Sequence, residues 1–180
     1  MNCPSISFLR ESVLIVVRNS FLGAIRTKTS LSIAVRETAI CRVAVLNKAW
    51  YEWESHSPIL RSAQGKSCLF PFISHASMSH TTAEITDAHV TAVLKSPPRK
   101  VTDGVVPEEL AAVLAYTDAM TLDVSVPDEV FAKLKEQFSN KEVVEITATI
   151  SAYNCVSRFL VALDVGERNA QLGPIEGSKE

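Results

Sequence analysis

The amino-acid sequence predicts an all-α fold. In several segments apolar residues recur at helical spacing, and these segments begin or end with residues that are typical of helix termini. No segment has a convincing β-strand pattern, so no sheet is expected. The chain has 180 residues, so we expect one domain that is long enough to bury an apolar core.

Two helices are predicted in the first third of the chain. Ser32 can cap a helix over residues 33–46, whose wide apolar face is typical of a helix enclosed by others. After a short break, a second helix is expected over about residues 49–63, with Gly65 as its stop signal. Pro58 falls within this second helix, where it would kink the helix or lie near its first turns.

Three shorter helices are expected next. Residues 85–94 have helical periodicity and are followed by two prolines. Residues 107–122 begin with proline and two acidic residues, which suit the unpaired amides and the dipole of a first helical turn. The same start signal recurs in residues 127–138, so we expect a third helix there.

The last predicted helix is long and apolar on most sides. Ser139 and Glu142 have the spacing of a capping box, and Gly166 is a stop signal, so residues 140–164 are expected to be helical. A helix that is apolar all round belongs in a core or in an oligomer interface. Its polar residues are expected to line a contact between helices: Glu142, Glu145, Tyr153, Asn154 and Arg158.

Three segments lack such signals. Residues 1–20 form an atypical N-terminal segment, residues 66–84 sustain no helical period and are expected to be an irregular insertion, and residues 166–180 are expected to be a flexible tail. The domain itself is expected over residues 21–165. The apolar run at residues 12–17 is too short for a membrane helix.

The charge and the cysteines argue against several classes of protein. The net charge is −2 with both signs interspersed, which leaves no clustered basic face for nucleic acid. The four cysteines are scattered without a C-x-x-C pair, which argues against a zinc site or a dithiol redox centre. Free thiols without a disulfide framework are typical of a reducing compartment, so we expect a cytoplasmic protein without membrane or nucleic-acid partners.

Three ionisable residues form the candidate catalytic site. Glu52 and His56 stand four positions apart and so share one face of a helix, and Glu37 lies nineteen positions before His56. Together they provide an acid, a base and an orienting group, the minimum for proton transfer. Each has a structural alternative: His56 as an ordinary structural histidine, Glu52 as a solvated first-turn acid, and Glu37 as an ion-pair partner of a neighbouring arginine.

Aromatic residues surround two of these candidates. Trp50, Tyr51 and Trp53 would wall a substrate pocket beside Glu52 and His56. Large aromatic side chains are also common in cores and interfaces, and this structural role is the alternative for all three.

Several motifs resemble those of one known family. They are Tyr51-Glu52-Trp53-x-x-His56, Leu114-Ala115-Tyr116-Thr117-Asp118-Ala119-Met120-Thr121, Val144-Glu145-Ile146, and Tyr153-Asn154 followed by Arg158-Phe159-Leu160-Val161-Ala162-Leu163-Asp164-Val165. The combination resembles the carboxymuconolactone decarboxylase-like family of the alkylhydroperoxidase D-like (AhpD-like) superfamily. The resemblance implies an AhpD-like helical bundle that assembles into trimers or hexamers, with active sites near subunit contacts.

The two branches of this superfamily suggest different chemistry. The peroxidase branch has the pattern Glu-x11-Cys-x2-Cys-x3-His, which falls on Glu37, Ala49, Glu52 and His56, so both thiols are missing here. Peroxide reduction by a thiolate needs at least one of them. The decarboxylase branch has a Glu-x3-His element, which Glu52 and His56 supply.

The resemblance therefore implies a decarboxylase-like lyase that transfers protons on a lactone or a related small carboxylated metabolite. Proton transfer needs no cofactor or metal, so none is expected. Two alternatives stay open. One is a peroxidase-like oxidoreductase with peroxiredoxin-type activity, working through Cys41 or without thiols. The other is a non-catalytic helical oligomer that kept the fold and lost the chemistry.

Overall fold

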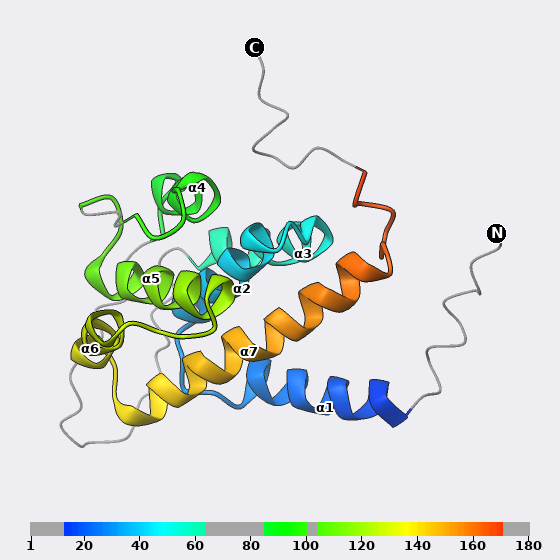
Figure 1. The fold of residues 1–180 in the computed structure, drawn as a ribbon, viewed down its shortest axis with the longest axis horizontal. Coiled ribbons are helices and arrows are strands. Elements are labelled where there is room, and N and C mark those ends of the chain that lie inside the picture. The colour runs from blue at the N-terminus through cyan, green and yellow to red at the C-terminus, as the bar shows by residue number, and fades with distance from the viewer. Residues whose placement is uncertain (1–12, 64–84, 101–103, 171–180) are drawn as a thin grey trace, which may run out of the picture.

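The computed structural model describes residues 13–63, 85–100 and 104–170, with side chains from residue 20 onward (Figure 1). Within these residues it contains seven helices and no strand, so the predicted all-α fold is confirmed. None of the seven is both long enough and apolar enough to cross a membrane. The helices are α1 (Val13–Thr27), α2 (Ile33–Leu46), α3 (Trp50–Ser62), α4 (Asp87–Lys95), α5 (Glu108–Leu122), α6 (Asp128–Gln137) and α7 (Asn140–Ala162).

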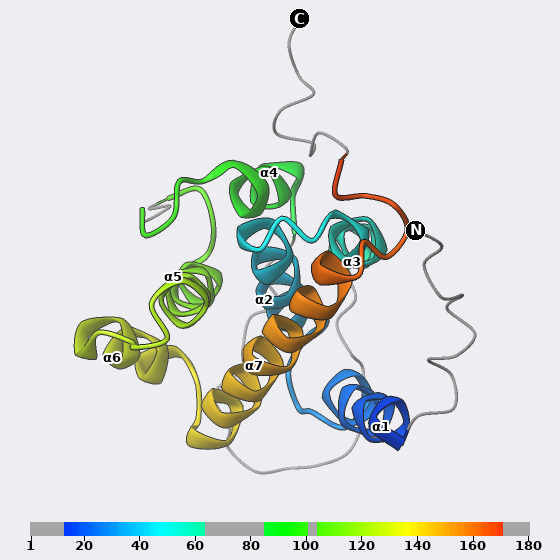
Figure 2. The same cartoon turned by 45° about the vertical axis from the view of Figure 1, so that its right-hand side comes forward.

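Helix α2 forms the centre of the bundle. It packs against α3, α4, α5 and α7, and Figure 2 shows these four helices around it. All its residues from Val35 to Val45 are buried except Arg36. Burial on every side agrees with the predicted wide apolar face, but it also places the charged groups of Glu37 and Arg42 in the interior, where each needs a partner.

Helix α1 lies along the outer side of α7, as Figures 1 and 2 both show. It is absent from the predicted helices because charged and polar residues interrupt its apolar run. Leu22 and Ile25 are buried, and Ser30 donates hydrogen bonds from its backbone N–H and its hydroxyl to Glu145 of α7, at 2.8 and 2.7 Å. Tertiary contacts thus stabilise a helix whose local signal is weak. It spans the expected domain limit between residues 20 and 21, which stays a prediction.

The predicted capping residues lie at the starts of their helices. The side chain of Ser32 accepts a hydrogen bond from the backbone N–H of Val35 at 3.2 Å. Ser139 and Glu142 form the predicted capping box at the start of α7. Pro58 lies inside α3, as expected.

Two helix ends differ from the predicted ones. Helix α4 starts later than residue 85 because Thr86 is its capping residue and accepts a hydrogen bond from the backbone N–H of His89. Helix α7 ends at Ala162 rather than at residue 164. The backbone already enters the left-handed region at Asp164, where φ is 46°, before it reaches Gly166.

Other predicted features lie outside the described residues. They are the stop signal Gly65, the irregular insertion at residues 66–84, most of the N-terminal segment, and the tail beyond residue 170. They stay predictions.

Arg42 is fully buried and joins three helices. Its Nε and Nη2 atoms donate to the two carboxylate oxygens of Asp118 on α5, at 2.6 and 2.9 Å. Its Nη1 atom donates to the carbonyl oxygens of Val93 on α4 and of Ser96 just beyond it, at 2.9 and 3.1 Å. The backbone N–H of Arg99 also donates to Asp118, at 2.8 Å. A buried charge is tolerated only when it is paired and hydrogen-bonded, so this network holds α2, α4 and α5 together.

Val124, between α5 and α6, has a strained backbone. Its φ is 66°, a region that β-branched residues rarely adopt, and its side chain gains little from packing because it is 84% exposed. We predict that Val124→Gly raises the free energy of unfolding by about 1 kcal/mol and the Tm by about 2–4 °C. Thermal unfolding followed by circular dichroism measures the change. Val105→Gly, at an exposed valine without a positive φ, is the control, and an equal gain there would contradict the prediction.

Candidate active site

Glu37 of α2 and His56 of α3 are in direct contact in the interior. The chain reverses between the two helices at Lys48, whose φ is 55°. The distance from His56 Nδ1 to Glu37 Oε2 is 2.7 Å, and because a carboxylate only accepts, Nδ1 is the donor. Glu37 is 2% exposed and His56 is 8% exposed. The contact fixes the tautomer of the imidazole and leaves Nε2 as the ring atom for proton transfer.

The second carboxylate oxygen of Glu37 also has a partner. Arg36 Nε lies 3.3 Å from Glu37 Oε1. The ion pair that was the structural alternative for Glu37 therefore exists beside the contact with His56. Arg42, the other nearby arginine in the sequence, pairs with Asp118 instead.

Glu52 is buried on the same helix as His56 and faces α7. The hydroxyl of Ser157 on α7 donates to Glu52 Oε1 at 3.0 Å. Burial raises the pKa of the Cys41 thiol, and the charges of Glu37 and Glu52 raise it further. Burial also raises the pKa of the Tyr153 phenol. The hydrogen bond and charge of Arg26 lower that pKa, and the charges of the same two carboxylates raise it. Both carboxylates thus act on one region of the interior. The three candidate residues are buried around it, and their catalytic roles stay predictions.

Tyr153 of α7 completes this cluster, although the sequence suggested only a structural role for it. Its ring meets the His56 ring edge-on, with the ring centroids 5.1 Å apart and the planes at 89°. Its hydroxyl accepts a hydrogen bond from Arg26 Nε of α1 at 2.8 Å. A buried tyrosine needs such a partner for its hydroxyl, and that need is the one signal that could have drawn attention to Tyr153.

No feature of the sequence indicated that Arg26 and Ser157 would contact this cluster. Arg26 lies 127 positions from Tyr153, and Ser157 lies 105 positions from Glu52. Contacts over such separations follow from the packing of α1 and α3 on α7, which no local pattern in the sequence describes.

The three aromatic candidates lie in different environments. Trp53 is buried in the core at 6% exposure, and Trp50 is half-buried and packs against that core. Tyr51 is 44% exposed and lies over Gly166, where an added Cβ would be 2.8 Å from its ring. The structural alternative thus describes Trp53 well. A role in substrate binding stays a prediction for all three.

Cys41 lies in α2, one helical turn after Glu37, and is fully buried. Burial raises the pKa of its thiol well above the ordinary value of 9.0, the carboxylates of Glu37 and Glu52 raise it further, and Arg61 lowers it. The thiolate is the reactive form of a cysteine, so this environment disfavours a nucleophilic role for Cys41.

We therefore predict that Cys41 of the folded protein resists alkylation by iodoacetamide at neutral pH. Cys155 is exposed on α7 and should react in the same sample, which makes it an internal control. Peptide mapping by mass spectrometry measures both sites, before and after unfolding in guanidinium. Equal rates for the two cysteines in the folded protein would contradict the prediction.

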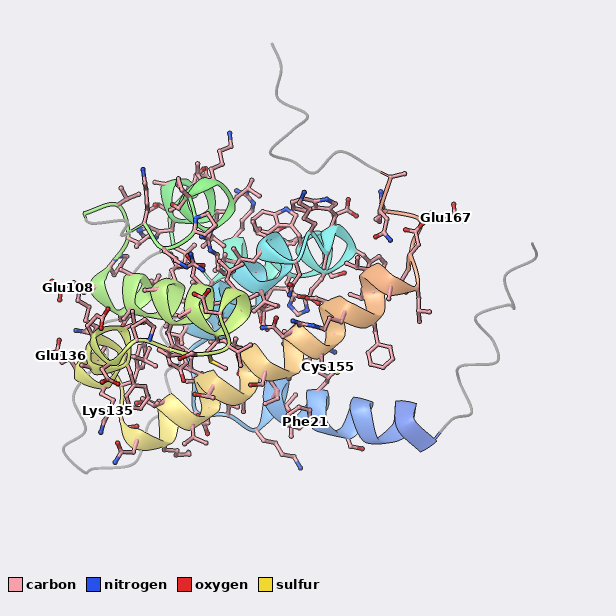
Figure 3. The ribbon with its side chains drawn as sticks, viewed as in Figure 1. Phe21, Glu108, Lys135, Glu136, Cys155 and Glu167 are labelled. Atoms are coloured by element: carbon pink, nitrogen blue, oxygen red, sulfur yellow. The ribbon has the colours of Figure 1, made fainter. Side chains whose placement is uncertain are left out.

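Two cavities lie away from this cluster. One, of about 270 Å³, lies between α5 and α6, and the other, of about 360 Å³, lies beside α4. Figure 3 shows Glu108 and Glu136, which line the first cavity, far from Cys155 on α7. None of the catalytic candidates lines either cavity. In the part of the chain that the structure describes, no group of His, Cys, Asp and Glu side chains is arranged to hold a metal ion.

Comparisons with known proteins identify the architecture. Neither a protein-family model nor a curated protein sequence matches the chain. The structure matches the crystal structure of a protein of unknown function from Agrobacterium tumefaciens that has been proposed to be the antioxidant defence protein AhpD. The TM-score is 0.68, and the match covers 95% of this chain and 98% of the other. The chain has the AhpD-like fold.

The AhpD-like fold agrees with the motifs that resemble this superfamily, so the predicted fold is confirmed. The sequence identity of the match is 18%, and the likeness therefore concerns the backbone architecture alone. What the buried cluster of this AhpD-like bundle does has to be argued from its own side chains.

Proposed function

We propose that the protein is a decarboxylase-like lyase of the AhpD-like superfamily that transfers protons on a lactone or a related small carboxylated metabolite. The observation that carries this proposal is the 2.7 Å contact between His56 Nδ1 and Glu37 Oε2 in the interior. A shielded Glu–His pair is suited to general acid–base catalysis, because the carboxylate orients the imidazole and stabilises its charged form.

The three ionisable candidates each have a role in this reaction. Loss of CO₂ from the lactone acid leaves the electron pair of the broken bond on the ring as a dienolate. His56 then delivers to carbon a proton that Nε2 has first taken up from solvent. Glu37 holds the Nδ1 proton and keeps the ring in place. Glu52, fixed by Ser157, tunes the charge of the region. A low-dielectric site strengthens each of these interactions.

The test is the release of CO₂ from carboxymuconolactone by the purified protein and its variants. His56→Ala should lower kcat by about 10²–10⁴-fold, the typical contribution of a general acid or base. Glu54→Gln, at an exposed position of the same helix, is the control and should keep the parent rate. Far-UV circular dichroism checks that both variants are folded. Unchanged turnover in His56→Ala would exclude the assignment.

A peroxidase-like oxidoreductase is the second candidate. Its support is the fold shared with the Agrobacterium tumefaciens protein, which has been proposed to be an antioxidant defence protein. The environment of Cys41 counts against it, because burial raises the pKa of the only thiol near the Glu–His pair among the described residues. Consumption of hydrogen peroxide with oxidation of Cys41 would favour this candidate over the lyase. Absence of both activities would favour a helical scaffold without catalysis.

The protein is further proposed to be a cytoplasmic homo-oligomer, a trimer or a hexamer. Apolar side chains on the outer surface support self-association: Val144 and Phe159 of α7 are 67% and 50% exposed, and Phe21 of α1 is 49% exposed. Light scattering coupled to size-exclusion chromatography measures the assembly, and a monomer at micromolar concentration would contradict it.

A further inference from the structure

Arg26 lies at the surface end of the buried cluster. It is an exposed residue of α1, yet its Nε is fixed 2.8 Å from the hydroxyl of the fully buried Tyr153. The guanidinium carbon lies 5.8 Å from the centre of the same ring. One of the five N–H donors of the guanidinium is thus used, and no carboxylate pairs with Arg26 among the described residues. The buried Tyr153 hydroxyl thus orients the Arg26 side chain, although Arg26 itself is exposed.

The Tyr153 ring connects this arginine to the catalytic pair. The Tyr153 ring contacts both residues. Its centroid lies 5.1 Å from that of the His56 ring, and the Arg26 guanidinium lies over the same ring. Arg26, Tyr153, His56 and Glu37 therefore form a continuous series from the surface to the interior. A single side chain, that of Tyr153, thus stands between Arg26 and His56 in this series.

The charges around His56 favour a cationic partner for an anionic substrate. Glu37 and Glu52 are both buried near His56, so an anionic substrate would meet two like charges there. Arg36 is already paired with Glu37. Arg26 carries a positive charge and has no carboxylate partner among the residues that the structure describes. A guanidinium binds a carboxylate through two parallel N–H donors.

We propose that Arg26 is the residue that binds the carboxylate of a small cyclic substrate, and that Tyr153 positions Arg26 for this contact by accepting the hydrogen bond from its Nε. This inference rests on the proposed function, because it names the substrate class of the same site. Tyr153 is a positioning residue: it is buried, and it acts through Arg26.

The test uses benzoate as the carboxylate probe and benzamide as its uncharged counterpart. Binding to the full-length protein is followed by NMR through the Arg26 Nε–H signal and the amide signals of α1 and α7. Benzoate should bind saturably and benzamide should not. Arg26→Gln should weaken benzoate binding at least tenfold, and Arg26→Lys should restore only part of it, because lysine keeps the charge and loses the planar fork.

Lys28→Gln is the matched control, because it removes the same charge two positions away and leaves the Arg26–Tyr153 contact intact. It should bind benzoate as the parent does. An equal loss in Lys28→Gln would show that binding follows net charge and would overturn the proposal, as would unchanged binding in Arg26→Gln. Inorganic phosphate that binds as tightly as benzoate would overturn the choice of a carboxylate.

Tyr153→Phe keeps the ring against His56 and removes the hydroxyl. It should weaken benzoate binding several-fold and make the Arg26 Nε proton exchange faster with water, a change that a purely structural role would not produce. An unaltered exchange rate and affinity would overturn the positioning role. His56→Gln should lose turnover and keep benzoate binding. If the parent protein shows no lyase activity but binds benzoate through Arg26, the proposed function is wrong and the carboxylate site is still supported.

Discussion

Glu37→Gln is expected to lower kcat for decarboxylation by about 10²–10⁴-fold. The substitution keeps the size of the side chain and removes the charge that orients His56 through the 2.7 Å contact with Nδ1. An amide presents a donor as well as an acceptor, so the imidazole can adopt the wrong tautomer. Steady-state assays with carboxymuconolactone measure the loss, which should fall on kcat more than on KM.

Glu54→Gln is the matched control for this variant. It makes the same chemical change at an exposed glutamate of α3 that pairs with Arg168 on the surface. Its rate should stay within about twofold of the parent, because exposed ion pairs contribute little. A Glu37→Gln protein that is folded and as fast as the parent would remove Glu37 from the mechanism.

Arg42→Ala is expected to lower the free energy of unfolding by about 3–5 kcal/mol. It leaves the buried Asp118 carboxylate without its main partner and removes the donors to the carbonyl oxygens of Val93 and Ser96. The connection between α2, α4 and α5 is lost in one change. Urea unfolding followed by circular dichroism measures the effect.

Two comparisons make this expectation specific. Arg42→Met combined with Asp118→Leu should be much less destabilising than Arg42→Ala, because no unpaired charge stays in the interior. Arg99→Ala should change the free energy of unfolding by at most about 1 kcal/mol, because its ion pair with Asp123 is exposed. Equal losses for Arg42→Ala and Arg99→Ala would contradict the structural role of the buried network.

The sequence predicts those parts of the fold whose causes are local. The capping box of Ser139 and Glu142 and the cap at Ser32 act within four residues, and the helices they start lie where expected. Helix α1 does not follow this rule. Leu22 and Ile25 are buried, α1 packs against α7, and the backbone N–H of Ser30 donates to Glu145, so the stabilising partners are more than 100 positions away.

The same distinction applies to the candidate site. The spacing of Glu37, Glu52 and His56 reflects two neighbouring helices, and for that reason the contact between Glu37 and His56 could be anticipated. The partners Tyr153 and Arg26 could not, because α7 and α1 reach the cluster only through tertiary packing. The pairing of Arg42 with Asp118 could not be predicted either, because no local sequence pattern distinguishes a buried arginine from an exposed one.

A double-mutant cycle on Glu37 and His56 is the most direct test of proton transfer by this pair. The turnover of Glu37→Gln, His56→Gln and the double variant is compared with the parent on carboxymuconolactone. If the two residues act as one unit, the double variant should be no slower than the slower single variant. A loss of turnover in the double variant that equals the product of the two single losses would contradict a shared role of the 2.7 Å contact. A parent-like rate in either single variant would contradict it too.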